Sequence, residues 1–376
     1  MNPFTIDTPV PPEELIDRER EVDRLLEAAE GGHNTRLSAP RRYGKTSVLL
    51  KVQAEAEKLG MATASVDFYG VLSLDDVVSR IEFAYERSLK GALGKWFSGV
   101  RRTLRPVARM GSPEASVEFA LLPESDKART LDTALDLPRR IFEREGIRTL
   151  VMFDEFQAVL GAGEVDAVLR SRIQHHRRVA SYIFAGSHPG MMRELFGSKS
   201  KPLYGQSRPL MLDPLPDEAL ADYIARKFQE TGRDPGAGLT PLLEVARGHP
   251  QRVMLLAHHL WEVTAKGETA DENTFSEALD VALTELQEVF ERTWDDFSVN
   301  ERRVMAAVAW TGRWGQGSSL YSKSTLNRFR LAKGSARDVR KALLARGEIE
   351  RAGGQAVRIT DPLLELWIAS ERRSRV

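Results

Sequence analysis

A continuous apolar run that ends in two acids, TLVMFDE at residues 149–155, constrains the fold of this chain more than any other feature. Such a run, with no polar alternation, is typical of a parallel β-strand buried on both faces. Two similar segments follow it at 180–187 and 209–215, and earlier strands are expected at 35–38 and 61–70. Helical periodicity lies between these strands, so the sequence predicts an α/β fold with a parallel sheet covered by helices on both faces.

Helical segments separate the predicted strands, and the strand signals stop at Pro216. Before that point we expect a candidate strand at 116–122 and helices at 13–30, 45–59, 74–109 and 127–145. After it, residues 217–295 show only amphipathic helices, and residues 298–370 combine helices with a β-hairpin at 350–359. At roughly 100–200 residues per domain, a chain of 376 residues accommodates three modules. We predict a core at 1–215, a helical domain at 216–296 and a third domain at 297–376.

The segment APRRYGKTS, residues 39–47, carries the strongest functional signal. Gly44, Lys45 and Thr46 match the second half of the phosphate-binding loop pattern G-x-x-x-x-G-K-[ST], whereas Ala39 stands where the first glycine is expected. The segment follows a strand and opens a helix, so the amides and dipole of the helix N-terminus would face phosphates. The predicted ATP- or ADP-binding residues are Pro40, Arg41, Arg42, Tyr43, Gly44, Lys45, Thr46 and Ser47.

The side chains of this loop suit a metal–triphosphate. Gly44 allows the backbone to approach closely, Lys45 would neutralise the β- and γ-phosphates, and the Thr46 hydroxyl would bind Mg²⁺. Asp154 and Glu155 end the strand at 149–155, and ligands of open α/β sheets bind at that carboxyl edge. Asp154 would hold Mg²⁺, and Glu155 would orient and polarise the attacking water. These residues predict ATP binding and hydrolysis.

With these motifs in this order, the chain resembles the archaeal-type ATPases, a branch of the STAND and AAA+ P-loop superfamily, over nearly its whole length. APRRYGKTSVLL looks like the family's GPRRxGKTSLL, and LVMFDEFQ looks like its hhhhDEhQ strand. DREREVDRL at 17–25 is similar to the GRExEL box before the loop, with Asp17 in place of the glycine. Three later segments resemble the next strand, the helical lid and the end of a winged-helix domain: IFAGSHPGMM at 183–192, GHPQRVMLL at 248–256 and ITDPLLELWI at 359–368.

This resemblance implies further roles. The box around Ile16 and Arg18 would lie against the adenine, and Ser187 or His188 would sense the γ-phosphate. His249 and Pro250 would line the adenine side of the lid, and Arg252 would reach the phosphates. Arg208 is placed like an arginine finger, which stabilises transition-state charge, often from a neighbouring subunit. The second and third modules would be the lid and the winged helix.

The amino-acid composition limits the kinds of ligand, membrane and partner that this chain could bind. The chain contains no cysteine, which excludes disulfides and thiolate metal sites. No stretch approaches the roughly 20 apolar residues of a membrane helix, and the N-terminus has neither the basic start nor the apolar run of a signal peptide. A cytoplasmic location and no integral membrane segment are expected. Residues 298–376 hold 16 basic and 7 acidic residues, a net charge of +9 in a chain whose formal total is zero. An anionic partner is therefore expected for the C-terminal part.

Two segments carry arginines that a nucleic acid would contact. The helix at 335–346 suits a recognition helix, with Val339, Leu343 and Leu344 facing inward and Arg337, Arg340 and Lys341 outward, and the hairpin carries Arg351 and Arg358. DNA binding and packing against a protein or the ATPase core remain open alternatives. Residues 90–109 carry six basic residues and no acid beside the apolar Trp96, Phe97, Val100 and Leu104. That pattern fits a helix that covers the sheet better than one that binds a membrane or a partner.

Two hypotheses from different classes follow. The first is an ATP-driven switch whose output is DNA binding or assembly, with self-association or a protein partner. The second is a non-catalytic nucleotide-binding scaffold, in which Ala39 marks a weakened loop and ADP is structural. A metabolic kinase would need an acceptor pocket, and no motif indicates one.

Overall fold

The computed structural model describes residues 1–6, 8–104, 124–162, 165–313, 319–354 and 356–370. Contacts within the chain divide it into two compact units. The first, called here the sheet unit, comprises residues 11–39 and 45–212. The second, called here the helical unit, comprises residues 1–10, 40–44 and 213–376. The lid and winged-helix boundary at 296 lies inside the helical unit and stays a prediction.

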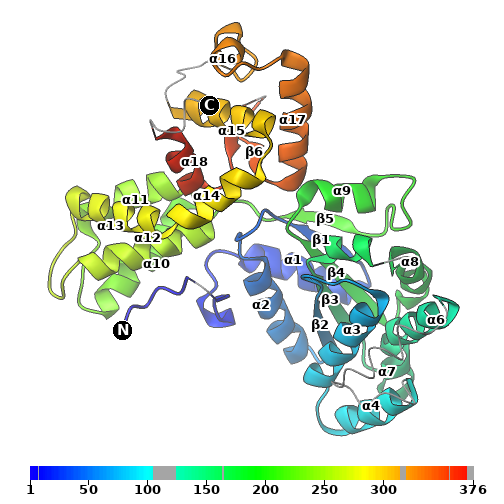
Figure 1. The fold of residues 1–376 in the computed structure, drawn as a ribbon. Helices are drawn as coiled ribbons and strands as arrows, with labels where there is room; N and C mark the ends of the chain where they lie inside the picture. The colour runs from blue at the N-terminus through cyan, green and yellow to red at the C-terminus, as the bar shows by residue number, and fades with distance from the viewer. Residues whose placement is uncertain (7, 105–123, 163–164, 314–318, 355, 371–376) are drawn as a thin grey trace. The chain divides into compact units, whose positions relative to one another are not determined.

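The sheet unit is built on a five-stranded parallel sheet with the order β2-β3-β4-β1-β5 (Figure 1). Every residue of the third and fourth strands is buried, as the apolar runs predict. All five predicted strands are confirmed. Their bounds are β1 Thr35–Ser38, β2 Ala62–Asp67, β3 Thr149–Asp154, β4 Ala180–Gly186 and β5 Arg208–Met211.

Helices connect the strands of this unit, which confirms the α/β fold. They are η1 Pro12–Glu14, α1 Glu19–Glu30, α2 Lys45–Lys58, α3 Leu74–Ser88, α4 Gly91–Leu104, α6 Glu124–Leu135, α7 Leu137–Glu145, η2 Phe156–Gly161, α8 Val165–His176 and α9 Pro189–Gly197. Helices α1 and α2 pack on each other, and α2 also contacts β2 and β3. On the other side of the strands, α3 packs on β2, α6 packs on α3 and α8, and α7 contacts β3.

Three predicted helix boundaries were wrong. The helix expected from residue 13 begins only at Glu19, because Leu15 is extended and Asp17 has a φ of 45°. The long helix expected at 74–109 is two helices, because Leu89 is extended with a ψ of 122°. The helix expected at 127–145 breaks after Leu135. The candidate strand at 116–122 and residues 105–109 lie outside the described residues.

The core of the sheet unit is rich in aromatic rings. Phe153 stacks on Phe68 and Phe156 at centroid distances of 5.3 and 5.8 Å, and Phe156 lies 4.8 Å from Phe184. On α4, Phe97 is 1% exposed and its ring lies 6.0 Å from that of Tyr85. This helix therefore covers the core through Phe97, in agreement with the covering interpretation of the basic segment.

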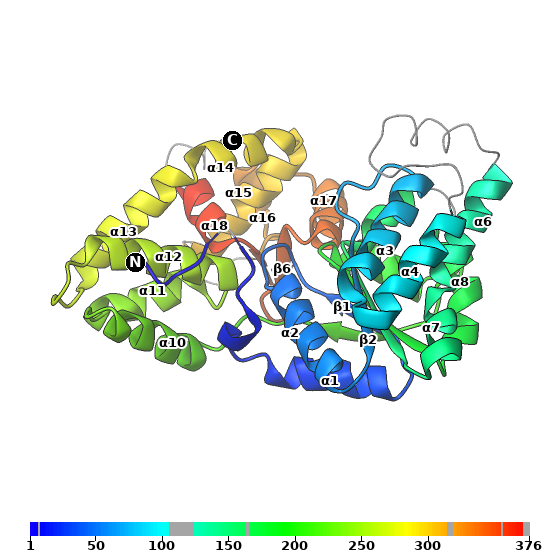
Figure 2. The same cartoon turned by 90° about the horizontal axis from the view of Figure 1, so that it is seen from below.

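The helical unit contains the remaining helices and one antiparallel hairpin, and α10 to α13 gather in both views (Figure 2). The hairpin lies at the predicted position. Helix α17 includes residues 335–346, which were predicted to form a helix. The elements are α10 Asp217–Glu230, η3 Gly236–Gly238, α11 Leu239–Ala246, α12 Pro250–Val263, α13 Glu272–Glu285, α14 Gln287–Asp296, α15 Val299–Arg313, α16 Lys323–Arg328, α17 Lys333–Arg346, β6 Ile349–Arg351, β7 Val357–Ile359 and α18 Pro362–Ala369. In the part of the chain that is described, no helix is long and apolar enough to cross a membrane.

The N-terminal residues belong to the helical unit although they precede the sheet in sequence. Phe4 is 3% exposed and packs on Phe228 and Tyr223 of α10 at centroid distances of 5.6 and 6.4 Å. The Asn2 amide donates to the His258 carbonyl at 3.1 Å. The N-terminal residues are therefore anchored to α10 by one buried ring.

Candidate functional site

The phosphate-loop motif lies between β1 and α2, as the sequence predicts. Lys45 is the first residue of α2, is 5% exposed and donates from Nζ to the Ala39 carbonyl at 3.3 Å. Ala39 is fully buried, and its φ is not positive. A methyl group is therefore accommodated where the pattern has its first glycine. Gly44 does need to be glycine, because its φ is 79°. A Cβ there would meet no described atom within 4 Å, so the loop backbone is open on that side.

The carboxyl edge of the sheet brings Asp154 to the start of α2. The Thr46 hydroxyl donates from Oγ1 to Asp154 Oδ2 at 2.9 Å, across 108 residues of sequence. The Glu155 amide donates to Asp154 Oδ1, also at 2.9 Å. Burial raises the pKa of Asp154, and the negative charge of Glu155 adds to this, while the Glu155 amide, the charge of Lys45 and the Thr46 hydroxyl work the other way.

A hydroxyl and a carboxylate in contact fit Mg²⁺, which binds through one or two protein oxygens, phosphate oxygens and water. Among the described residues, no cluster of three or more His, Cys, Asp or Glu side chains could hold a metal ion by itself. The donor set at Thr46 and Asp154 therefore fits a cation that arrives with phosphates.

Glu155 belongs to a polar cluster at the ends of β3 and β4. Its Oε2 accepts from the Ser187 hydroxyl at 2.5 Å and from the Gln157 amide. The same Gln157 amide donates to Ser187 Oγ at 3.2 Å and lies 3.2 Å from His188 Nδ1. The structure thus brings the predicted Glu155 and Ser187 together. Gln157, 7% exposed, is a residue that the sequence analysis did not assign, although it is the last residue of the LVMFDEFQ motif.

In the helical unit, the loop residue Tyr43 contacts the predicted lid residues. Its ring lies 5.0 Å from the His249 ring at 72°, and its hydroxyl donates to Glu350 at 3.0 Å. His249 precedes α12, and Pro250 is the first residue of that helix. Burial lowers the pKa of His249 to about 4, so the ring is neutral at pH 7, and its Nδ1 accepts from the Arg252 amide at 3.3 Å.

Arg252 is ion-paired in this structure. Its Nε donates to the two carboxylate oxygens of Asp361 at 2.9 and 3.0 Å. The resemblance implies that Arg252 reaches the phosphates, but the structure shows that part of its guanidinium is already bound by Asp361.

The remaining predicted residues lie elsewhere. Ile16 is half-buried, and Arg18 is 4% exposed and donates to Glu21 at 3.2 Å. Arg208 begins β5 and pairs in register with Thr35, so it lies at the amino edge of the sheet, opposite Asp154. It contacts His33 there at 3.2 Å. Arg208 therefore lies away from the carboxyl edge of its own sheet, and an arginine-finger role could serve only a second copy.

No protein-family model matches this sequence. No curated protein matches it either. Solved structures do match the fold. A Walker-type ATPase of Pyrococcus abyssi is similar, with a TM-score of 0.68, 18% sequence identity, and 96% of this chain and 98% of that chain covered. The ORC2 protein of Aeropyrum pernix, solved as ADPNP–ADP complexes, has a TM-score of 0.59 and 16% identity, with 95% and 93% of the two chains covered.

At these identities the likeness defines the fold alone. This chain has an AAA+-like P-loop fold, in which a parallel-sheet core is followed by a C-terminal helical region.

Proposed function

We propose that this protein binds Mg-ATP and hydrolyses it as a molecular switch of the AAA+/STAND type. The observation that carries the proposal is the contact between Thr46 Oγ1 and Asp154 Oδ2 at 2.9 Å, at the N-terminus of the helix that Lys45 opens. The similar Walker-type ATPase and the ORC2 protein solved as ADPNP–ADP complexes support this function through the fold.

Each residue of the site has a role in this proposal. The Gly44 amide region and Lys45 bind the β- and γ-phosphates, and Thr46 and Asp154 hold Mg²⁺, which when bound neutralises developing phosphate charge. Glu155 accepts a hydrogen bond from the attacking water and orients it. The Ser187 hydroxyl and the Gln157 amide fix the Glu155 carboxylate, since both donate to its Oε2.

Phosphate release separates the switch from a non-catalytic scaffold. We expect Glu155→Gln to bind nucleotide but to release phosphate on the order of 100-fold more slowly than wild type, the usual effect of losing a general base. Lys45→Ala should lose nucleotide binding, measured by equilibrium titration with a fluorescent nucleotide. Equal, background-level phosphate release by wild type and Glu155→Gln would leave only the scaffold.

Nucleic-acid binding is a second proposed function, and it rests on α17. Lys333, Arg337 and Lys341 are exposed at i, i+4 and i+8 along this helix, so they form one basic stripe. Other basic residues of the region are held by acids: Arg346 donates to Glu301 at 2.5 Å and Arg358 to Glu350 at 2.6 Å. The exposed stripe would contact backbone phosphates, whereas Arg358 of the hairpin is paired within the protein.

A salt series tests this stripe. Replacing both Arg337 and Lys341 with alanine should weaken binding to duplex DNA. The slope of log affinity against log salt concentration should become less negative by about two, because two phosphate contacts that release counterions are lost. The exposed Lys266→Ala, on the turn after α12, is the control and should leave the slope unchanged. Binding that does not depend on salt, or equal slopes in all proteins, would count against the stripe.

A further inference from the structure

The charges of the helical unit are segregated along the chain. Residues 271–296, which include α13 and α14, hold nine acidic residues and one arginine, a net charge of −8. All ten of these charged side chains are exposed. Residues 298–376, by contrast, hold 16 basic and 7 acidic residues. One unit therefore carries a strongly acidic helical surface and a strongly basic region that follows it in sequence.

One face of α13 gathers acids around a shallow depression. Glu277, Asp280 and Glu285, called here the acidic stripe, line a depression of about 680 Å³ together with Val281 and Thr284. Within the described part of the chain, neither Glu277 nor Asp280 makes an ion pair. Val281 is 42% exposed, so the acids flank an apolar side chain that nothing in its own unit covers. This face is suited to a basic partner.

The basic stripe of α17 complements this face in charge and in length. Helix α17 holds five basic residues and a single acid, Asp338. Lys333, Arg337 and Lys341 are exposed and make no ion pair with any residue that the structure describes. Each stripe covers eight residue steps, from 277 to 285 and from 333 to 341, which is about 12 Å along a helix axis. Two stripes of opposite charge and equal length can therefore lie along each other.

The two stripes do not meet within one chain. Helix α13 packs on α12, α11 and α14, whereas α17 packs on α15 and β6. The two helices are well separated in both views of the molecule (Figures 1 and 2). Since both belong to the helical unit, this separation is a property of that unit alone. Each stripe is thus available to another molecule.

We propose that the acidic stripe of one copy docks on the basic stripe of a second copy, so that the protein self-associates through its helical unit. A second copy is the partner that these observations favour, because the chain itself carries the complementary stripe at the same spacing. This inference goes beyond nucleotide hydrolysis and DNA binding. Since DNA is proposed to use the same basic stripe, a bound duplex and a docked copy exclude each other at α17.

The first test is the salt dependence of association, measured on the full chain without nucleic acid. Exposed ion pairs are individually weak and are screened by salt, so the association should be reversible. Sedimentation velocity should show it rising with protein concentration at about 0.1 M salt, and should show it lost at about 1 M salt, where the screening length is only about 3 Å. A protein that stays monomeric up to its solubility limit at the lower salt, or that associates equally at both, would overturn the proposal.

Charge reversal locates the contact. Glu277→Lys combined with Asp280→Lys should weaken self-association at least about tenfold, because two attractions become repulsions. Arg337→Glu combined with Lys341→Glu should weaken it to the same extent. Mixing the two double variants should restore association, since every stripe then finds an opposite charge on the other protein. A mixture that remains monomeric, or a loss in only one of the two variants, would contradict docking between these stripes.

The matched control is a pair of acids elsewhere on the helical unit. Glu218 and Asp222 are exposed on α10, and Glu218→Lys with Asp222→Lys changes the net charge by the same amount as the reversal on α13. This control should associate as the wild-type protein does. An equal loss of association in the control would show an effect of net charge alone and would refute the specific contact.

Cross-linking provides a measurement that needs no variant. A carbodiimide joins a lysine amine to a carboxylate that it touches. In a mixture of isotopically light and heavy wild-type protein at low salt, mass spectrometry should find peptides of the basic stripe joined to peptides of the acidic stripe, with one light and one heavy member. Association without such mixed pairs would overturn the proposal even if the charge-reversed proteins do not fold.

Discussion

Glu155 shows how strongly a single residue can be fixed by its surroundings. It adopts a left-handed backbone conformation, with a φ of 48° and a ψ of 40°, which is rare outside glycine. Asp17, Arg42 and Arg247 also have positive φ values, between 45° and 66°. Such conformations persist only where neighbouring contacts hold them, and they are common at functional sites. At Glu155 this conformation accompanies side-chain contacts with Ser187 and Gln157.

Adding one methyl group at Gly186 tests whether the contacts of Glu155 with Ser187 and Gln157 matter for activity. A Cβ at Gly186 would lie 2.6 Å from Gln157 Oε1 and 2.5 Å from Met192 Sδ, so both side chains would have to move. We expect Gly186→Ala to retain nucleotide binding and to lose roughly tenfold or more in phosphate release, because small misplacements near reacting groups are costly. The measurement is steady-state phosphate release together with nucleotide affinity.

Gly197→Ala is the matched control for this prediction. Its added Cβ meets only Arg193 Cγ at 3.8 Å, an ordinary contact, and it lies at the end of α9. Full activity in Gly186→Ala would show that Gln157 does not position Glu155.

Some residue-scale features could be predicted from sequence and others could not. Lys45, Thr46 and Asp154 lie in local motifs whose flanking strands and helix fix their positions, so their meeting was predictable. Gln157 was missed because its role depends on Ser187 and Glu155, which meet only when β3 and β4 pair. Asp17 stands where the similar GRExEL box has a glycine, and the structure gives Asp17 the positive φ that a glycine would readily adopt and that aspartate tolerates.

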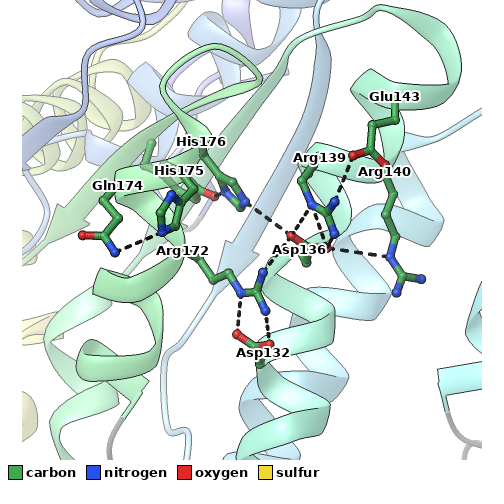
Figure 3. A network of polar contacts seen from close by, with 10 residues as sticks. Asp132, Asp136, Arg139, Arg140, Glu143, Arg172, Gln174, His175 and His176 are labelled. Carbon is green, nitrogen blue, oxygen red and sulfur yellow. Dashed lines mark hydrogen bonds and ion pairs between the residues drawn. The ribbon is translucent and has the colours of Figure 1, made fainter.

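At the scale of elements, one charge network joins α6, α7 and α8 (Figure 3). Asp136, whose side chain is 6% exposed, accepts from Arg139 Nε at 2.9 Å and from Arg172 Nη1 at 3.1 Å. Arg172 also pairs with Asp132, and His176 Nε2 lies 3.7 Å from Asp136. Burial acts to raise the pKa of Asp136, but Arg139, Arg172 and His176 outweigh it and hold that pKa below its usual range.

Asp136→Asn is therefore expected to destabilise the sheet unit by about 2 kcal/mol. This cost is smaller than the cost of breaking a fully buried ion pair, because Arg139 and Arg172 keep contact with solvent. Because the folded-state pKa is depressed, the stabilisation is complete above the ordinary value near 3.8 and is lost as pH falls through the folded value. Denaturant unfolding of both proteins at pH 7 and near pH 3 measures this. The difference should shrink in acid, and a constant difference would contradict the charge explanation.

Helix boundaries were less predictable than helix positions, for a physical reason. The sequence periodicity at 74–109 and 127–145 is continuous, but the first helix ends at the extended Leu89, and the second is divided at Asp136, whose ψ of −3° departs from regular helix. Periodicity reports which face is apolar and does not report where the axis changes direction.

At the scale of the whole molecule, the grouping of distant segments was the least predictable feature. The α/β class and the parallel sheet follow from local patterns and general rules of connection, whereas the order of the strands was not predicted. By contrast, Tyr43 meets Glu350 across 307 residues, and Asn2 meets His258 across 256. Nothing in the local sequence of either partner indicates such contacts, because they depend on packing of the complete chain.

Phe4 gives a prediction at this scale. Replacing this buried ring with alanine should destabilise the helical unit by about 3 kcal/mol, the usual cost of a buried phenylalanine cavity. Hydrogen exchange should show the effect on α10, where Tyr223 and Phe228 lie, and not on the sheet strands. The exposed Thr5→Ala is the control. Equal protection of α10 in wild type and Phe4→Ala would contradict the anchoring role.

The discontinuity of the helical unit limits how the protein can be dissected. This unit draws on three stretches of chain, and only the longest, 213–376, is continuous over the length of a domain. A fragment cut at residue 213 would leave behind both Phe4 and Tyr43, and would uncover the rings of Phe228 and His249. We expect such a fragment to aggregate when expressed alone, and to gain solubility when a peptide carrying residues 1–10 is supplied in trans.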